Sequence, residues 1–235
     1  MNGIKAVMLV GGLGTRLRSV LPSKPKVLAS IGDRPFLELP VRQLRSQGIR
    51  QLVMCTGYLA DQIESRFGDG TRWNVSIEYS KEETPLGTAG ALKLARHYVG
   101  NVPEFFVLNG DSFLEIDFQD LMRFHRVHPD AVATMAVVRV ENADRYGTVK
   151  VDSNDRVSGF AEKTGGDAPG LVNGGVYVFS QAVWESIPEG PSSMERDVFP
   201  RLLNRGVYAR EQRGMFIDIG TPADYERAQE LLRSV

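Results

Sequence analysis

The sequence predicts an α/β fold in which helix, sheet and helix form a three-layer, Rossmann-like α/β/α arrangement around a mixed sheet. Through the first half, short apolar runs of strand length alternate with segments that carry apolar residues at helical spacing. This alternation is typical of a largely parallel sheet with crossover helices on both faces. In the second half, strand-like runs follow one another with little helix between them, which indicates an antiparallel extension of the sheet.

The predicted elements of the first half are short and mostly hydrophobic. Because open parallel sheets bind ligands at the carboxyl ends of their strands, we expect a site where the strands end in glycine-rich segments. The predicted strands are residues 4–10, 51–56, 76–79 and 105–108, and the predicted helices are residues 36–47, 60–67 and 88–98.

The second half contains the predicted antiparallel strands and two helices. Thr221 is a predicted N-cap, with Pro222 at the first helical position and Asp224 three residues after the cap. No linker-like stretch separates the halves, so we expect residues 1–235 to form a single domain. The predicted strands are residues 131–140, 148–152, 157–160 and 172–179, and the predicted helices are residues 193–204 and 221–232.

Composition indicates a folded globular protein. The chain has 235 residues, of which 42% are hydrophobic and 24% charged, enough to bury a sizeable core. No apolar run approaches the roughly 20 residues that cross a bilayer, and the N-terminus does not resemble a signal peptide. Cys55 is the single cysteine and fits a buried core position in a reducing compartment, so we expect a cytoplasmic protein without a membrane partner.

Charge is distributed unevenly along the chain. The net charge is −1, yet residues 1–32 contain five basic residues and no acid, and four of the five lie between Arg16 and Lys26. A local excess of this size suits a small polyanion better than a nucleic acid, which would require a broad basic face. A basic surface loop without a ligand explains the charge equally well.

A glycine-rich segment follows the first predicted strand. Gly11, Gly12 and Gly14 allow backbone N–H groups to approach phosphate oxygens, and the start of the next helix adds partial positive charge. Leu17 stands where a dinucleotide fingerprint has its third glycine, and no Gly-Lys-Ser/Thr follows as in a P-loop. A tight turn without a ligand is the alternative, which the nearby cations Arg16 and Lys26 make less favourable.

Two acidic residues lie in apolar surroundings far apart in the sequence. Residues 105–108 lead into Asn109-Gly110-Asp111, which brings a carboxylate to the sheet edge where a metal could meet a triphosphate. Asp218 is embedded in an apolar strand and needs a partner, which a cation, hydrogen-bond donors or a metal could provide. A common turn is the alternative for Asp111, and a structural salt bridge for Asp218.

Two histidines offer a weaker metal signal. His125 and His128 lie three residues apart on a predicted helix, but no third ligand is evident nearby in the sequence. We therefore expect them on a solvated helix face rather than in a zinc site.

Taken together, these segments resemble the sugar-phosphate nucleotidyltransferase, or NDP-sugar pyrophosphorylase, family. The resemblance covers essentially the whole chain and implies the nucleotide-diphospho-sugar transferase fold. Several ordered motifs carry it, and Val27 departs from the second proline of many relatives while Lys26 is retained. The motifs are Gly11-Gly12-Leu13-Gly14-Thr15-Arg16-Leu17, Pro25-Lys26, Pro85-Leu86-Gly87-Thr88-Ala89-Gly90, Asn109-Gly110-Asp111, Glu162-Lys163, Asn173-Gly174-Gly175 and Asp218-Ile219-Gly220-Thr221.

The resemblance implies a division of roles among these residues. Arg16, Lys26, Asp111 and Asp218 are the implied catalytic residues, and Asp111 and Asp218 the implied Mg²⁺ ligands. The implied sugar-binding residues are Tyr146, Gly147, Glu162, Lys163, Asn173 and Gly174. The implied nucleotide-binding residues are Leu9, Gly11, Gly12, Gly14, Thr15, Arg16, Lys26, Glu82, Pro85, Gly87, Thr88, Asn109 and Gly110.

Within the family, the pattern is most similar to D-glycero-D-manno-heptose 1-phosphate guanylyltransferases, which implies GTP and a sugar 1-phosphate as substrates. This similarity rests on residues 32–38, 145–149 and 218–225. Other sugars and bases remain open, including mannose 1-phosphate with GTP, glucose 1-phosphate with dTTP or UTP, and MurNAc 1-phosphate with UTP. A homodimer is compatible with the sequence, which does not determine the oligomeric state.

Base selection can be argued from chemistry. Guanine presents two adjacent donors, N1–H and the 2-amino group, and one carboxylate can accept from both. Glu82, three residues before Pro85, is the predicted acceptor, with Glu83 as the alternative. A solvent-facing acidic pair is the interpretation without a ligand.

Two other classes of protein remain as alternatives. A nucleotide-sugar-dependent glycosyltransferase usually carries an Asp-x-Asp motif, whereas Asp111-Ser112-Phe113 lacks the second acid. A regulatory module need not retain the charged positions that are present here.

Overall fold

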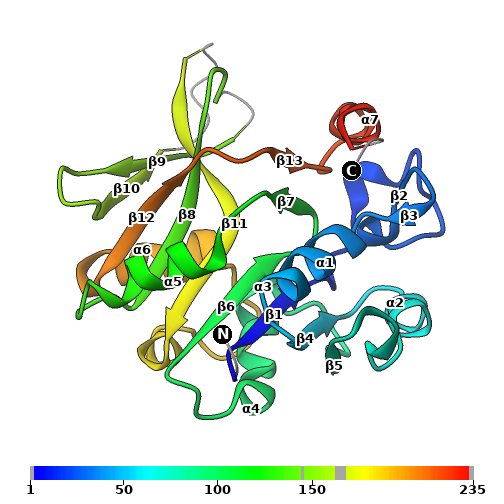
Figure 1. The fold of residues 1–235 in the computed structure, drawn as a ribbon, viewed down its shortest axis with the longest axis horizontal. Coiled ribbons are helices and arrows are strands. Elements are labelled where there is room, and N and C mark those ends of the chain that lie inside the picture. Colours follow the sequence, from blue (N-terminus) through cyan, green and yellow to red (C-terminus); the bar gives the residue numbers. More distant parts are fainter. Residues whose placement is uncertain (1–2, 144–145, 162–167, 233–235) are drawn as a thin grey trace.

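The computed structural model describes residues 3–143, 146–161 and 168–232, and these residues form a mixed sheet covered by helices on both faces (Figure 1). Four neighbouring strands are parallel, in the order β6 (Glu104–Asn109), β1 (Lys5–Leu9), β4 (Gln51–Thr56) and β5 (Ser76–Lys81). They agree with the four strands predicted for the first half.

The antiparallel extension begins at β11 (Gly170–Ser180), which pairs with β6 in the opposite direction. β11 also pairs with β8 (Ala133–Val140) and β9 (Thr148–Val151), and β9 pairs with β10 (Val157–Ala161). These four strands were predicted. A further strand, β12 (Val207–Gln212), was not predicted and lies parallel to β8 at the edge of the extension.

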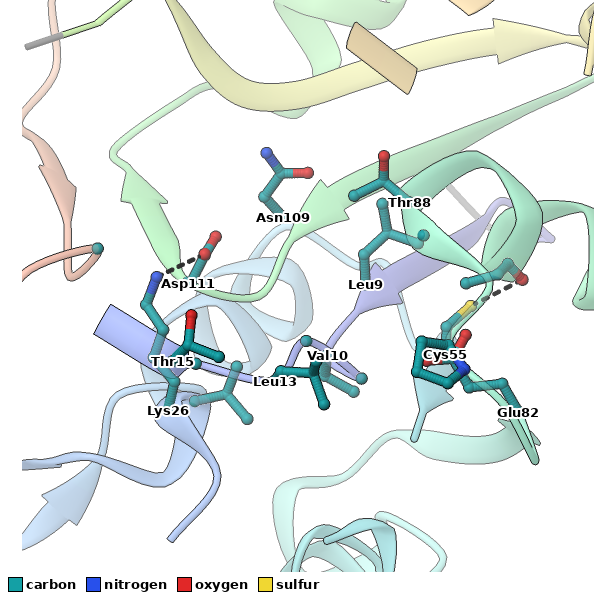
Figure 2. A pocket seen from close by; sticks show the side chains of 18 of the residues that line it. Leu9, Val10, Leu13, Thr15, Lys26, Cys55, Glu82, Thr88, Asn109 and Asp111 are labelled. Carbon is teal, nitrogen blue, oxygen red and sulfur yellow. Dashed lines mark hydrogen bonds and ion pairs between the residues drawn. The ribbon is translucent and has the colours of Figure 1, made fainter. Parts of the chain in front are cut away.

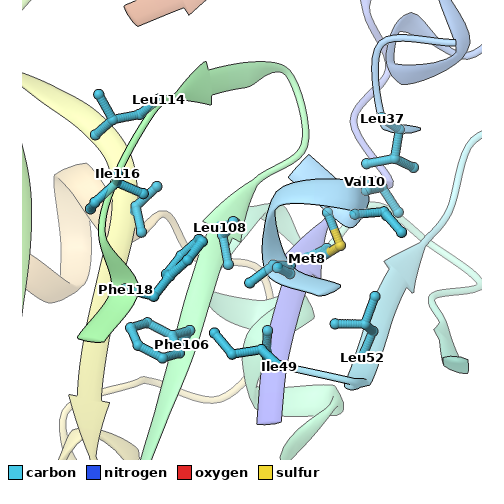
Figure 3. Close-up of a cluster of buried hydrophobic side chains, with 14 of the residues drawn as sticks. Met8, Val10, Leu37, Ile49, Leu52, Phe106, Leu108, Leu114, Ile116 and Phe118 are labelled. Atoms are coloured by element: carbon cyan, nitrogen blue, oxygen red, sulfur yellow. The ribbon is translucent and has the colours of Figure 1, made fainter. Parts of the chain in front are cut away.

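The two faces of the sheet bury separate apolar clusters. Met8 and Phe106 face one cluster, whereas their neighbours Val7 and Val107 face the other, as the twofold side-chain alternation of a strand requires. The first cluster packs under α1 (Glu38–Ser46), α2 (Ala60–Phe67) and α5 (Phe118–Arg126) and is seen in Figure 3. The second packs under α3 (Gly87–Leu94), α4 (Arg96–Val99) and α6 (Phe199–Leu202). The predicted three-layer α/β/α fold is therefore confirmed.

A third apolar cluster holds a small lobe beside the carboxyl edge of the parallel strands. The lobe contains the hairpin β2 (Ser30–Ile31) and β3 (Arg34–Pro35), the pair β7 (Ser112–Leu114) and β13 (Phe216–Asp218), and α7 (Pro222–Leu231). Tyr225 of α7 donates to the Ser30 carbonyl at 2.8 Å, which ties two distant parts of the sequence together. As predicted, Thr221 caps α7 by accepting from the Asp224 N–H.

The predicted helix 193–204 is more irregular than its periodicity indicates. It consists of a π-helical turn at Met194–Val198, the short α6 and a 3₁₀ turn at Leu203–Arg205. Pro200 lacks an N–H and so cannot continue a regular helical ladder from the preceding turn. In the described parts of the chain, no helix is both long and apolar enough to cross a membrane.

His125 corrects one expectation, because it is buried and does not lie on a solvated face. Its side chain is 3% exposed on α5, and its Nδ1 lies 2.8 Å from the Thr134 hydroxyl of β8. Burial lowers the pKa of this imidazole to about 4. His125 thus belongs to the core between α5 and the sheet.

The depressed pKa of His125 should make the fold acid-sensitive. The unfolded chain takes up a proton near pH 6.5 and the native chain only near pH 4, so stability is fully present above pH 6.5 and falls as the pH drops through this window. The free energy of unfolding should decrease by roughly 1.4 kcal/mol per pH unit from this residue. His125→Gln is expected to lose less thermal stability than the wild type between pH 7 and pH 4.5. Identical pH profiles for the variant, the wild type and the exposed control His97→Gln would contradict this account.

Candidate active site

A cavity of about 480 Å³ lies at the carboxyl ends of β1, β4 and β6, where the sequence analysis placed the site (Figure 2). Leu9, Cys55 and Asn109 line it from the ends of these three strands. Cys55 is 2% exposed, its Sγ lies 3.6 Å from the Ala91 carbonyl, and burial raises the pKa of its thiol well above the usual range. Cys55 is therefore a small packing residue and not an activated nucleophile.

The glycine-rich segment after β1 forms one side of this cavity. Gly14 adopts a left-handed conformation with φ 58°, and a Cβ at Gly11 would lie 3.0 Å from the Gly57 nitrogen, so both positions favour glycine. Thr15–Leu17 forms a single 3₁₀ turn, which corrects the expectation of a helix with a sizeable dipole at this point. Positive charge in the cavity therefore comes mainly from the side chains of Arg16 and Lys26, which both line it.

Asp111 and Asp218 are brought together by the pairing of β7 with β13. Asp218 lies opposite Ser112 in this antiparallel pair, and the Ile219 N–H donates to the Asp111 carbonyl at 3.0 Å. Lys26 Nζ donates to Asp111 Oδ2 at 2.7 Å, as the dashed line in Figure 2 marks. Two acids separated by more than a hundred residues in the sequence thus converge beside one buried lysine.

The electrostatics of Asp218 are unfavourable without an additional positive charge. Burial, together with the nearby negative charge of Asp111, raises the pKa of Asp218 to about 6, against the opposing effects of Lys26 and of a hydrogen bond from the Gly220 N–H. That hydrogen bond is 2.6 Å long and ends on Asp218 Oδ1. Lys26 contributes one positive charge to two carboxylates, so the salt-bridge interpretation of Asp218 leaves the local charge unbalanced.

Glu82 lies at the other end of the cavity from Asp111 (Figure 2). Its Oε2 accepts from the Leu86 N–H at 3.0 Å, and burial raises its pKa. Gly57 makes room for the side chain, since a Cβ at that position would lie 2.5 Å from Glu82 Oε1. Glu83 is exposed and does not line the cavity, so the two residues are not an equivalent solvent-facing pair.

A second cavity of about 370 Å³ shares Arg16 with the first. Tyr146, Gly147 and Asn173 line it, together with Asp218, Thr221 and Asp224. Arg16 therefore lies where the cavities meet, with Asp111 on the wall of the first and Asp218 on the wall of the second.

A bulge in β11 presents Asn173 to this second cavity. The register between β11 and β8 shifts between Asn173 and Tyr177, and Gly175 has φ 73°. A Cβ at Gly175 would lie 2.3 Å from Ser112 Oγ, and one at Gly174 would lie 2.7 Å from a Leu114 methyl group. Both glycines therefore let β11 pass close to β7, and Gly174 has a packing role here.

The structure places most of the predicted site residues around the two cavities. Gly110 instead packs behind the wall of the first, where its N–H donates to the Leu9 carbonyl at 2.9 Å. Glu162 and Lys163, with Arg145 of the heptose-like stretch, lie outside the described residues. The predicted residues that line the first cavity are Leu9, Gly11, Gly12, Gly14, Thr15, Arg16, Lys26, Glu82, Pro85, Gly87, Thr88, Asn109 and Asp111.

Sequence reasoning missed two acids that line the cavities. Glu195 lines the first, inside a segment that was predicted only as helix, and Asp224 lines the second, where it was assigned only to a helix cap. Asp224 does take part in the helix cap as predicted, but the capping pattern gave no indication that its side chain lines the second cavity together with Asp218.

These features define a class of α/β protein with a glycine-lined, cationic cavity and two neighbouring acids at the carboxyl edge of a mixed sheet. The chain belongs to the nucleotidyl transferase family, whose family model matches residues 5–235, and to the sugar-phosphate nucleotidyltransferases within it. The resemblance inferred from the motifs is thereby confirmed.

Relatives of known sequence point to guanylyltransferases. Mannose-1-phosphate guanylyltransferase catalytic subunit beta of Drosophila pseudoobscura pseudoobscura is 37% identical over 227 residues, which are 95% of this chain and 61% of that protein. Mannose-1-phosphate guanyltransferase beta-A of Xenopus laevis is 37% identical over 226 residues, 94% of this chain and 62% of that protein. The chain thus spans about three fifths of the length of these relatives.

Solved structures agree in fold over nearly the whole chain. HddC from Yersinia pseudotuberculosis complexed with GMP-PN is 34% identical, with a TM-score of 0.85 over 97% of this chain and 99% of that one. A Bacillus anthracis protein of known structure gives a TM-score of 0.87 at 25% identity, over 99% of this chain and 96% of that one.

Proposed function

We propose that this chain joins a sugar 1-phosphate to a nucleoside triphosphate, with GTP favoured, and releases pyrophosphate in a Mg²⁺-dependent reaction. The observation that carries this proposal is the convergence of Asp111, Asp218 and Lys26 where the glycine-lined cavity meets the second cavity. The named guanylyltransferases among the relatives and the GMP-PN bound to HddC support the preference for guanine.

The two cavities suggest a division of the substrates. The nucleotide lies in the first, with its base toward Glu82 and its phosphates along the glycine-rich segment and Arg16. The sugar 1-phosphate enters the second, between Tyr146, Asn173 and Asp224. Its phosphate oxygen then attacks the α-phosphorus of the nucleotide, the bond from that phosphorus to the β-phosphate bridging oxygen breaks, and pyrophosphate leaves with the electron pair.

The chain's own residues catalyse this step through position and charge. Two anions repel one another as they meet, so catalysis depends on holding them in line and neutralising them. Arg16 binds the departing pyrophosphate through its planar fork, and Lys26 neutralises the α-phosphate or the incoming sugar phosphate. A general base is not needed, because a phosphate nucleophile is already ionised at neutral pH.

The residues at the junction fit a magnesium ion. Mg²⁺ prefers oxygen ligands and is commonly held by one or two carboxylates together with substrate phosphates. Asp111 and Asp218 supply such carboxylates, and a divalent cation would offset the burial and the nearby charge of Asp111 that together raise the pKa of Asp218. When bound there, Mg²⁺ would supply charge neutralisation for the phosphate oxygens.

Glu82→Gln is expected to impair the use of GTP. The carboxylate is suited to accept from both guanine N1–H and the 2-amino group, and an amide offers one acceptor and one mismatched donor. kcat/KM for GTP should fall by on the order of tenfold to a hundredfold, while the melting temperature stays close to that of the wild type. Steady-state kinetics with Glu83→Gln as the matched control checks this. GTP kinetics unchanged in Glu82→Gln would remove Glu82 from base recognition.

The sugar is proposed to have the manno configuration. The heptose-like motifs favour D-glycero-D-manno-heptose 1-phosphate, and the names of the relatives favour mannose 1-phosphate. The two rings carry the same hydroxyl configuration and differ in the exocyclic chain, so the second cavity can be tested with both.

A substrate panel tests the proposed function. Sugar 1-phosphates, including the heptose, mannose, glucose and MurNAc compounds, are combined with GTP, UTP, dTTP, CTP and ATP in the presence of Mg²⁺. Pyrophosphate release with GTP and a manno sugar is the expected result. Nucleotide binding without pyrophosphate release from any pair would instead support a regulatory module.

A further inference from the structure

Glu195 lies at a position in the first cavity that the proposed mechanism does not use. Its Oε2 accepts from Thr88 Oγ1 at 3.2 Å and from Ser193 Oγ at 2.9 Å. Its side chain is exposed and lines the cavity, so a bound substrate can reach it.

The charge of Glu195 also acts on the buried hydroxyl of Tyr177. Burial and, to a smaller extent, the negative charge of Glu195 raise the pKa of this hydroxyl. Tyr177 in turn accepts from Asn173 Nδ2 at 2.6 Å, and Asn173 lines the second cavity. The Glu195 carboxylate thus lies beside Thr88 at the wall of the first cavity, whereas Asn173, the partner of Tyr177, lines the second.

The backbone holds this carboxylate in place with an unusual turn. Glu195 lies in the π-helical turn Met194–Val198, and such turns occur frequently at functional sites. The Met194 N–H donates to Thr88 Oγ1 at 2.8 Å, and the Ser193 N–H donates to Asp197 Oδ2 at 2.7 Å. The turn is therefore fixed within itself and also to residues 85–90, the loop that leads into α3 and the first turn of that helix.

Further main-chain hydrogen bonds attach the preceding residues to the same loop. The Ser192 carbonyl accepts from the Ala89 N–H at 2.9 Å, and the Ser192 N–H donates to the Leu86 carbonyl at 2.8 Å. A Cβ at Gly87 would lie 2.5 Å from the Ser192 carbonyl oxygen, so the two segments are in close contact. The position of Glu195 relative to the nucleotide cavity is therefore well defined by the backbone.

The chemistry of a carboxylate restricts what Glu195 can recognise. An ionised carboxylate is an acceptor only, and it repels the phosphates that Arg16 and Lys26 attract. Hydroxyl groups are suitable donors, and acidic side chains bind ribose hydroxyls in other nucleotide-binding proteins.

We propose that Glu195 is a specificity-determining residue that accepts a hydrogen bond from a hydroxyl group of the bound substrates. Both the ribose of the nucleotide and the ring of the sugar 1-phosphate carry such hydroxyls, and the two sources are separated by experiment. This inference rests on the proposed function, because it assigns one further contact to the same site.

Deoxy analogues test the inference. kcat/KM is measured for GTP, 2′-deoxy-GTP and 3′-deoxy-GTP at fixed sugar 1-phosphate, and for the sugar 1-phosphate and its 2-deoxy analogue at fixed GTP. The wild type is expected to prefer the hydroxylated substrate in at least one arm by about tenfold. In Glu195→Gln, which weakens the acceptor, and Glu195→Ala, which removes it, that preference should shrink to within about threefold. The substrate series in which the preference for the hydroxylated compound shrinks identifies the hydroxyl group that Glu195 contacts.

Glu185→Gln is the matched control. Glu185 is an exposed glutamate outside the two cavities that pairs with Arg205, and its substitution removes the same charge as Glu195→Gln. It should retain the wild-type preference in every arm. If both Glu195 variants also retain it, or lose activity equally toward hydroxylated and deoxy substrates, the inference is overturned and Glu195 merely supports Thr88.

Binding constants for the same nucleotides and sugar phosphates, measured by calorimetry, test the role of Glu195 independently of turnover. Absence of turnover in the wild type would contradict the proposed function alone. A selective loss of hydroxyl preference in the binding constants would still support the role of Glu195, whereas unchanged binding ratios would reject it.

Discussion

Asp218→Asn is expected to lower kcat by on the order of a thousandfold and at the same time to raise the melting temperature of the metal-free protein by a few degrees. Asparagine retains an oxygen for the Gly220 N–H but removes a buried negative charge that faces Asp111. Without a bound metal ion, Lys26 offsets only part of the electrostatic cost of that charge, and this cost disappears in the variant. Turnover is measured by pyrophosphate release and thermal unfolding by circular dichroism in EDTA.

The opposite signs of the two effects distinguish the roles of Asp218. A structural salt bridge predicts lower stability and retained turnover in Asp218→Asn, which would reject the metal-ligand proposal. Asp33→Asn is the control, because the Asp33 side chain is 92% exposed in the same lobe and should change neither quantity. Addition of Mg²⁺ with nucleotide should stabilise the wild type more than Asp218→Asn.

Lys26→Gln is expected to lower kcat by about a hundredfold to a thousandfold and, in contrast to Asp218→Asn, to destabilise the protein. Lys26 has a side chain that is 10% exposed and donates to Asp111 at 2.7 Å. Its removal leaves two acids without their shared cation, so the melting temperature should fall by roughly 3 °C or more.

Lys24→Gln is the control for Lys26, because Lys24 is an exposed cation of the same basic segment. It should retain turnover and stability. Wild-type turnover in Lys26→Gln, measured at saturating concentrations of both substrates, would show that this lysine does not act on the reacting phosphates.

The parallel half of the fold could be predicted because local sequence determines it. The strand at Gln51–Thr56 and the helix at Ala60–Phe67 agree with the prediction at both ends, since each buried apolar run is bounded by residues that end it. The position of the glycine-rich segment at the end of β1 followed from the general behaviour of parallel sheets. The sequence therefore indicated where the first cavity lies.

The short strands β7 and β13, and the approach of Asp218 to Asp111 that they cause, could not be predicted in the same way. β7 and β13 have three residues each, too few for a periodic signal, yet their pairing places Asp218 beside Asp111. Asp111 and Asp218 were related to one another only through the resemblance to a family. Burial of His125 likewise depends on its contact with Thr134 of a neighbouring strand, which helical spacing alone does not reveal.

The place of Glu195 in the first cavity could not be predicted from the sequence either. Its periodicity indicated a helix, but a π-helical turn changes the direction of each side chain relative to a regular helix. The hydrogen bond to Thr88 joins residues more than a hundred positions apart. A residue of this kind becomes visible only when the tertiary contacts are known.

The small lobe that contains β7, β13 and α7 has a consequence for the order in which the two cavities form during folding. Its apolar cluster joins residues from three distant parts of the sequence, including Ala29, Phe113 and Ile219. Long-range contacts of this kind form late, because the entropy of closing the intervening chain must be overcome first. A folding intermediate that has completed the parallel strands would accordingly have the glycine-lined cavity and Lys26 in place but would still lack Asp218 of β13. When the denatured protein refolds, nucleotide affinity should therefore return before pyrophosphate release.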